Sequence, residues 1–361
     1  MSLNLVTAGE SHGPALVGIL SGLPAGLVLD RDAIDADLVR RQQGYGRSPR
    51  QQLEQDTVEV LAGLRHGRTL GTPLALVVRN RDHKNWEWGM SPWPREGEPS
   101  GKGLRPVTLP RPGHADLPGT LKYGLTDARD ALERASARQT AVAVAAGAVA
   151  KALLGYIEVD VLGRVVTEAL EERIDGARAD RDTVGGVVEV RAHGVPPGLG
   201  SYASKEERLD ARLASALMGI QAVKGVEIGA GFELAERRGS EAHDEILADD
   251  DGNLYRETNH AGGIEGGISN GEPVVVRAAM KPLPTLMRPL RSVDLETGEP
   301  GEALVERSDV AAVEALAVVA EAAVAFELAR AAREKFGGDA LGDFVGAWAA
   351  YLDRIPWQPT R

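Results

Sequence analysis

Short apolar runs separated by glycine-rich turns fill the start of the chain. Residues 3–8 and 15–20 are apolar runs of strand length, and residues 9–13 between them form a turn. A second turn at residues 22–27 precedes a helical pattern over residues 32–43. A further apolar strand covers residues 74–78. The pattern predicts strands and helices that follow one another at short spacing.

Two long segments rich in Ala and Val predict buried helices. Residues 128–154 carry no charge in their second half until Lys151. Residues 310–336 follow Ser308 and Asp309, either of which stands where a helix N-cap is expected. A helix with so wide an apolar face has to be covered by other elements, so both helices are expected to run through the middle of the molecule.

One long loop interrupts these elements. Residues 83–106 are rich in Pro and Gly and contain Trp86, Trp88 and Trp93. Loops of this length in a compact domain are usually functional or disordered, and the three tryptophans favour a functional lid.

The chain also repeats itself. Three short patterns return in the same order: residues 22–27 as 194–199, 34–38 as 209–213, and 71–73 as 271–273. We therefore expect an internal duplication in an α+β fold, a β-α-β sandwich whose sheet-plus-helix halves enclose the Ala-rich helices. The expected single domain covers residues 1–336, with halves of about 1–155 and 156–336, and residues 337–361 form a C-terminal tail.

Composition narrows the functional classes. The net charge of -12 argues against a general nucleic-acid binder, and the absence of Cys excludes disulfides and thiolate chemistry. The longest uncharged apolar run, residues 141–150, is shorter than the ~20 residues of a membrane span. With no export signal at the start, a cytoplasmic protein without membrane or nucleic-acid partners is expected.

The charge is unevenly distributed. Residues 1–140 hold 18 Lys and Arg against 16 Asp and Glu, whereas the remainder holds 23 against 37. The stretch 38–53 carries Arg40, Arg41, Arg47 and Arg50. Such a local positive field can attract an anion, although a solvated basic loop has the same pattern.

Standard nucleotide and metal motifs are absent from the sequence. Residues 97–102 resemble a phosphate loop but are one residue too short, and no Gly-x-Gly-x-x-Gly follows a strand. The seven His residues show no pair at the spacing of helical metal ligands, so no metal site is expected.

The turn at residues 9–13 matches the Gly-x-Ser-x-Gly pattern of a nucleophile elbow. This gives one enzyme hypothesis, a serine hydrolase with Ser11 as nucleophile. An elbow needs a helix directly after it, whereas Pro14 and a strand-like run follow here. We favour a polar corner that presents Ser11 and His12 to a ligand.

Other motifs point to an anionic ligand. A rigid turn places Arg111 close to His114, which could act as an acid toward a leaving phosphate, and Arg134 and Arg138 lie one helical turn apart at the head of a buried helix. The Gly-dense residues 259–269 permit close approach of a flat or phosphorylated molecule. A plain surface turn, or acidic partners for the arginines, would explain these patterns without a ligand.

Taken together and in order, these motifs resemble chorismate synthase. The resemblance rests on residues 9–13, 111–116, 134–140, 222–229, 259–269, 280–282 and 307–309, and covers almost the whole chain up to about Phe336. The usual Arg-Ser-Ser-Ala-Arg-Glu-Thr of that family is replaced here at Ala135 and Gln139, and Ser308 stands where His is common.

The resemblance implies the chorismate synthase fold and a lyase of the shikimate pathway, which makes aromatic amino acids. Its reaction is a 1,4-anti elimination of phosphate from 5-enolpyruvylshikimate 3-phosphate to give chorismate. Reduced FMN is required with no net redox change, and NADPH serves as an indirect reductant, so an external flavin reductase is expected. The family also implies a homotetramer. A flavin-binding protein without catalysis is a further alternative.

The resemblance also implies roles for single residues. His12 would protonate or charge-balance the reduced flavin, His114 would assist the departing phosphate, and Asp309 would tune or deprotonate flavin N5. Arg41 and Arg47 match NADP or phosphate positions, and Ser11, Arg111 and Arg138 match substrate contacts. The implied FMN contacts are Arg134, Ala135, Ser136, Gln221, Ala222, Gly266, Lys281, Pro282, Leu283, Pro284, Thr285 and Arg307.

Overall fold

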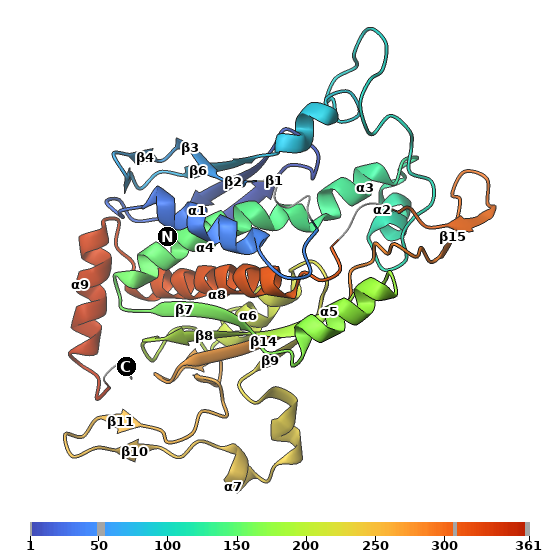
Figure 1. Cartoon of the computed structure of the whole chain (residues 1–361). Helices are drawn as coiled ribbons and strands as arrows, with labels where there is room; N and C mark the ends of the chain where they lie inside the picture. The colour runs from blue at the N-terminus through green and yellow to red at the C-terminus, as the bar shows by residue number, and fades with distance from the viewer. Residues whose placement is uncertain (1, 49–54, 306–308, 358–361) are drawn as a thin grey trace.

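Two four-stranded antiparallel sheets form the outer layers of the protein in this computed structural model (Figure 1), which describes residues 2–48, 55–305 and 309–357. The first sheet has the strand order β1-β2-β6-β3 and the second β7-β8-β14-β9. Their bounds are β1 Asn4–Ala8, β2 Ala15–Ser21, β3 Val58–Ala62, β6 Leu74–Arg79, β7 Asp160–Val165, β8 Gly186–His193, β9 Val223–Ile228 and β14 Val274–Met280.

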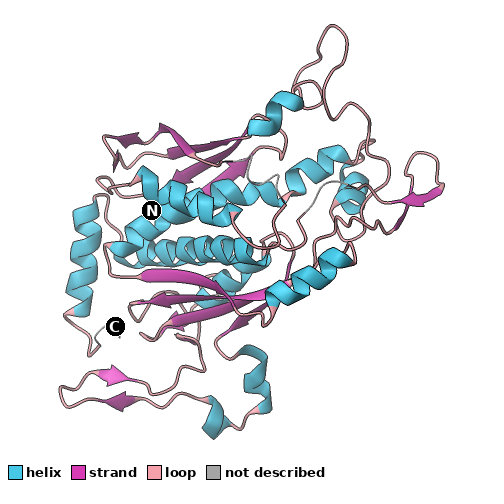
Figure 2. Cartoon of the chain, in the orientation of Figure 1, coloured by secondary structure: helices cyan, strands magenta, loops and turns pink. Residues whose placement is uncertain are grey.

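Helices fill the space between the sheets (Figure 2). The two long ones, α4 (Thr140–Gly155) and α8 (Val313–Phe336), pack on each other and are buried along most of their length. The shorter α1 (Arg31–Gln42) and α6 (Leu209–Met218) pack beside them. The expected α+β sandwich with buried Ala-rich helices is confirmed.

The two halves share one topology. In each sheet the strands that come first, second, fourth and third in the sequence lie in that spatial order. In each half a helix follows the second strand, α1 or α6, and a long central helix follows the fourth, α4 or α8. The internal duplication expected from the repeated turn patterns is therefore present in the fold, and its exact limits within the chain stay a prediction.

The other elements lie around this sandwich. α9 (Leu341–Leu352) stands across one end of it and buries Phe344 completely (Figure 1). Among the described residues, the remaining helical elements are η2 Arg81–Asn85, α2 Asp116–Tyr123, α3 Arg129–Ala135, η3 Ala137–Gln139, α5 Leu170–Ala179, η4 Gly231–Glu236 and α7 Gly239–Ala242. The two-stranded pairs are β4 Leu64–Arg65 with β5 Arg68–Thr69, β10 Leu247–Ala248 with β11 Leu254–Tyr255, β12 Ile264–Glu265 with β13 Ile268–Ser269, and β15 Arg291–Val293 with β16 Pro300–Glu302.

The central helices approach each other and one sheet so closely that only glycine fits at the contacts. A Cβ at Gly147 of α4 would overlap with the Cβ of Ala322 in α8. A Cβ at Gly163 of β7 would overlap with the backbone oxygen of Ala317 in α8. Interiors are packed to crystal-like density, so these two positions fix how α8 lies on α4 and on the second sheet.

A buried charge network ties the same elements together. Glu321 of α8 accepts two hydrogen bonds from Arg40 of α1 (both 2.9 Å), one from Lys151 (2.7 Å) and one from the backbone N–H of Gly163 (2.9 Å). Burial raises the pKa of Glu321, but these hydrogen bonds outweigh it and lower the pKa below its usual value. A fully partnered buried charge specifies how its neighbours are arranged, because removing one partner leaves another unpaired.

The expected helix over residues 128–154 is present but interrupted. α3 ends at Ala135, Ser136 is extended (ψ 141°), and the short η3 leads into α4. The Ser136 hydroxyl accepts a hydrogen bond from the backbone N–H of Arg138, an alternative to helical bonding that Ser commonly offers. Residues 129–155 are long and apolar enough to cross a membrane, but 72% of their most apolar window is buried inside the protein.

The expected N-cap of the second helix is wrong. α8 begins at Val313, its N-cap position is Ala312, and no side chain caps it. Asp309 instead accepts a hydrogen bond from the backbone N–H of Ser48 (2.7 Å) and pairs with Arg47. Ser308 lies outside the described residues.

Substitution of Gly147 tests the close helix contact. We expect Gly147→Ala to lower the free energy of unfolding by about 1–3 kcal/mol through overpacking against Ala322, although Ala favours an isolated helix by about 1 kcal/mol. The matched control is Gly155→Ala in the same helix, where an added Cβ would meet no described atom within 4 Å. Urea denaturation of both variants measures the effect, and equal stability of the two would contradict this packing.

Candidate active site

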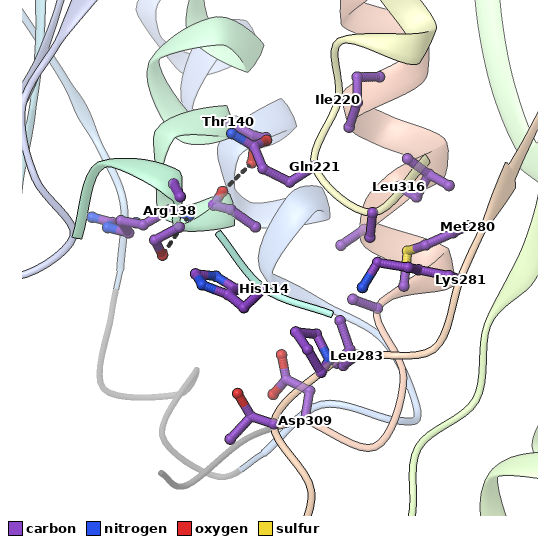
Figure 3. A pocket seen from close by; sticks show the side chains of 18 of the residues that line it. His114, Arg138, Thr140, Ile220, Gln221, Met280, Lys281, Leu283, Asp309 and Leu316 are labelled. Atoms are coloured by element: carbon purple, nitrogen blue, oxygen red, sulfur yellow. Dashed lines mark hydrogen bonds between the residues drawn. The ribbon is translucent and has the colours of Figure 1, made fainter. Parts of the chain in front are cut away.

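A cavity of about 710 Å³ opens at one end of the sandwich, where the N-termini of both central helices meet (Figure 3). Thr140 begins α4 and Leu316 lies in the first turn of α8, and both line it. The segment after α6 and the end of β14 complete the wall with Gln221 and Met280. Helix N-termini carry partial positive charge, so this end of the fold favours an anion.

Three arginines concentrate positive charge on one side of the cavity. Arg41 donates to the Thr140 hydroxyl (2.8 Å), and both Arg41 and Arg138 face the carboxylate of Asp56 (3.5 and 2.5 Å). Arg47 pairs with Asp309 (2.8 Å). Burial lowers the pKa of Arg41 to about 9, Asp56 opposes this shift, and Arg138 and Arg47 add to it. The three guanidiniums thus face only the two carboxylates of Asp56 and Asp309, so the cluster keeps an excess of positive charge.

His114 belongs to a compact network around a fully buried carboxylate. Asp116 accepts hydrogen bonds from the Nδ1 side of His114 and from Arg111, whose Nε lies 2.8 Å away. Arg111 also donates to the Thr285 hydroxyl (2.9 Å). Burial raises the pKa of Asp116, but His114 and Arg111 outweigh it and hold that pKa well below its usual range. The network presents a histidine and an arginine together at the cavity.

His12 is held in a similar way by a second buried carboxylate. Its Nδ1 lies 2.8 Å from Oε1 of Glu133, and its backbone N–H donates to Oε2 of the same side chain (2.8 Å). The imidazole stacks on the indole of Trp86 with ring centres 3.9 Å apart. Each histidine of the site is thus paired with a carboxylate that is almost completely inaccessible to solvent.

The opposite side of the cavity is largely apolar, and Figure 3 shows Leu316, Met280 and Leu283 across from Arg138 and His114. Burial lowers the pKa of Lys281, and Lys224 adds to this shift. The Nζ of Lys281 donates to the carbonyl oxygen of Gly113 (2.9 Å). The apolar lining consists of Ala135, Ala137, Met218, Ile220, Ala222, Val223, Met280, Leu283, Pro284, Ala312, Ala315, Leu316 and Val319.

Most residues singled out from the sequence lie together in this cavity. The lining includes Ser11, His12, Arg41, Arg47, Arg111, His114, Ala135, Ser136, Arg138, Gln221, Ala222, Lys281, Leu283, Pro284, Thr285 and Asp309. These residues come from both duplicated halves, so the cavity forms only when the halves pack together.

Three of the predicted residues do not line the cavity, and a fourth lies outside the described residues. Arg134 donates to the backbone oxygen of Thr7 (3.1 Å) instead, and Pro282 lies between two lining residues without lining the cavity itself. Gly266 lies in the β12–β13 hairpin, which precedes β14, so a strand about 20 Å long separates it from Met280. Arg307, like Arg50, lies outside the described residues.

Two partners in the site carry no sequence signal. Asp56 and Glu133 are distant in sequence from Arg138 and His12, which they contact, and nothing in their spacing identifies them. Trp86 was singled out within the long loop, but its contact with His12 was not. Asp116 belongs to the turn motif 111–116. Its position two residues after His114 could have identified it as a partner of that histidine. Among the described residues, no group of three or more His, Asp and Glu is placed to hold a metal ion.

Comparison with known proteins agrees with this arrangement. The family model described as chorismate synthase matches residues 3–167 and 162–332. A protein of Desulforudis audaxviator named chorismate synthase is 53% identical over 98% of each chain, and one of Geobacter sulfurreducens with the same name is 51% identical over 98% of this chain and 99% of its own. This chain belongs to the chorismate synthase family.

A solved structure supports the fold assignment of this family member. The structure titled "Crystal Structure of Chorismate Synthase" superposes with a TM-score of 0.78 and 37% identity, and covers 99% of both chains. The serine-hydrolase interpretation of Ser11 is not favoured. The turn that holds Ser11 leads into strand β2 rather than a helix, and the Ser11 hydroxyl lies 3.2 Å from the hydroxyl of Ser136.

Removal of the Asp116 charge tests the His114 network. We expect Asp116→Asn to lower the free energy of unfolding by about 3 kcal/mol at pH 7, because it leaves Arg111 buried without its carboxylate. The folded-state pKa of Asp116 is depressed, so its stabilisation is fully present above about pH 4 and is lost as the pH falls through the folded-state value.

The stability difference between the variant and the wild type should accordingly shrink as the pH falls below about 4, where the unfolded chain takes up the Asp116 proton first. Urea titrations across this range measure it, with Asp250→Asn at an exposed position as the control. A variant as stable as the control at pH 7 would show that the network contributes nothing to folding.

Proposed function

We propose that this chain is a chorismate synthase, a lyase that removes phosphate from 5-enolpyruvylshikimate 3-phosphate by 1,4-anti elimination. One proton leaves a ring carbon, the phosphate leaves with the electrons of its C–O bond, and a conjugated diene forms with no net redox change. The observation that carries the proposal is the cavity itself, in which two carboxylate-held histidines and an arginine cluster share one space. The substrate's phosphate and two carboxylates match this excess of cations.

Reduced FMN is the cofactor that we propose, and the residues of the cavity fit it. The volume is in the range of cofactor sites, and one apolar wall suits a flat ring system. Arg47 pairs with Asp309, but within the described chain its buried Nε has no hydrogen-bond partner, so this nitrogen could donate to a bound ligand. When bound, the reduced flavin supplies the electron density that weakens the allylic C–O bond.

The proposed FMN contacts follow from the family and from this geometry. Ala135, Ser136, Gln221, Ala222, Lys281, Leu283, Pro284 and Thr285 line the cavity, and Arg134 and Pro282 adjoin lining residues. Gly266 and Arg307 remain contacts proposed from the family alone. Arg41 and Arg47 would bind a phosphate, of NADP or of another ligand.

The side chains divide the elimination between them. Arg111 and His114 bind the departing phosphate, and His114 donates a proton to it. His12, which is paired with Glu133, balances the negative charge of the reduced cofactor. Asp309, oriented by Arg47 and the backbone N–H of Ser48, is the carboxylate that accepts a proton. Ser11 and Arg138 hold the substrate carboxylates.

Other properties are proposed from the family. The chain would act in the cytoplasm as a homotetramer in the shikimate pathway, and a separate reductase would keep its FMN reduced at the expense of NADPH.

An anaerobic assay tests the proposed function. Chorismate and phosphate should appear in equal amounts when the protein meets 5-enolpyruvylshikimate 3-phosphate with reduced FMN, and not with oxidised FMN. Absence of product under reduced conditions, with FMN still bound, would support a flavin-binding protein without catalysis. Covalent labelling of Ser11 by a phosphonate, or turnover without flavin, would instead support the hydrolase.

Variants of the two histidines test their roles. We expect His12→Ala and His114→Ala each to lower kcat by about 10²-fold or more, because each removes a group that donates or holds a proton. FMN binding, measured by flavin fluorescence, should change little. The control is His193→Ala, since His193 is exposed at the end of β8. Near-normal turnover of both site variants would overturn the assignment.

A further inference from the structure

We propose that Glu133 is a positioning residue that fixes the orientation and the proton arrangement of His12, with Trp86 holding the plane of the ring. The proposal rests on the proposed function, since it assigns how one of its proton-carrying groups is held. The structure places Glu133, His12 and Trp86 in one buried cluster beside the cavity.

Glu133 fixes the rotation of the imidazole. Both of its oxygens contact the same residue, Oε1 at Nδ1 and Oε2 at the backbone N–H of His12, each at 2.8 Å. The backbone oxygen of Glu133 also accepts from the N–H of Ser11 (3.1 Å). A side chain that is 1% exposed and bound at both oxygens has little freedom, so its partner has little freedom either.

Trp86 fixes the plane of the ring. Its indole is nearly parallel to the imidazole, at 20°, and its own Nε1 donates to Asp82 (3.0 Å). The guanidinium of Arg129 lies near the same indole, 5.1 Å from its centre, and near Glu133 (3.6 Å). The long tryptophan-containing loop is thereby connected to His12 through Trp86.

The contact has a chemical consequence. A carboxylate can only accept a hydrogen bond, so the proton at the contact belongs to Nδ1 of His12. Any proton that His12 exchanges with a ligand therefore passes through Nε2.

The decisive variant is Glu133→Gln, which keeps the shape of the side chain and removes its charge. Its amide oxygen can still accept from the backbone N–H of His12, which turns the NH₂ group toward Nδ1. Because that group donates, Nδ1 has to accept, and the proton of the neutral ring moves to Nε2. We expect kcat to fall by about 10²-fold with little change in KM.

The proton position is measured directly by ¹⁵N NMR of histidine-labelled protein at about pH 9, where ordinary histidines are neutral. The His12 signals are assigned by comparison with His12→Gln. The wild type should show an Nδ1–H ring and Glu133→Gln an Nε2–H ring, while Glu133→Asp should restore the wild-type pattern in part. Glu10→Gln, which removes an exposed carboxylate two residues from His12, is the matched control and should resemble the wild type.

An unchanged His12 spectrum and unchanged kcat in Glu133→Gln would overturn the proposal. Unfolding of both Glu133→Gln and Glu133→Asp, detected by circular dichroism, would also overturn it, because Glu133 would then serve folding alone. Lack of turnover in the wild type would contradict the proposed function, and the nitrogen spectra would still decide the role of Glu133.

Discussion

The close contact between the two central helices is the constraint on which the structure depends. α4 and α8 meet where Gly147 leaves no room for a side chain against Ala322, and the second sheet approaches α8 equally closely at Gly163. Once these contacts are made, both helices begin at the same end of the sandwich. Their N-termini then line one side of the cavity, and turns and strand ends line the other sides.

The buried carboxylates in and near this cavity each contact several partners. Glu321, Asp116 and Glu133 are each almost fully buried, and each binds at least two partners. In a low-dielectric interior an unpartnered charge is costly, so such sets restrain their members strongly. The arginine cluster differs, because Asp56 and Asp309 stand against three guanidiniums. The buried carboxylates and their partners hold the reactive groups in fixed orientations. The arginine cluster keeps an excess of positive charge that attracts an incoming anion.

Local patterns predicted much of this from the sequence, and long-range contacts explain what they missed. Strands β1, β2 and β6, the buried helices and the duplication follow from apolar periodicity and repeated turns, as at residues 22–27 and 194–199. The break at Ser136 was not predicted, because the helical periodicity of the sequence continues through it. The helix is interrupted there by the hydrogen bond from the backbone N–H of Arg138 to the Ser136 hydroxyl. Motif residues such as His114 and Arg138 were found, whereas Glu133 and Asp56 required the fold to bring them near.

The late position of α8 in the chain has a consequence for biosynthesis. Leu316 and Val319 close the cavity, yet they are among the last parts of the sandwich to leave the ribosome. During synthesis the first half can form its sheet, α1 and α4, but the face of α4 that packs on α8 has no partner until α8 arrives. The growing chain therefore exposes that face until α8 has been made and gains no stability from a ligand before then, which makes aggregation a hazard during synthesis.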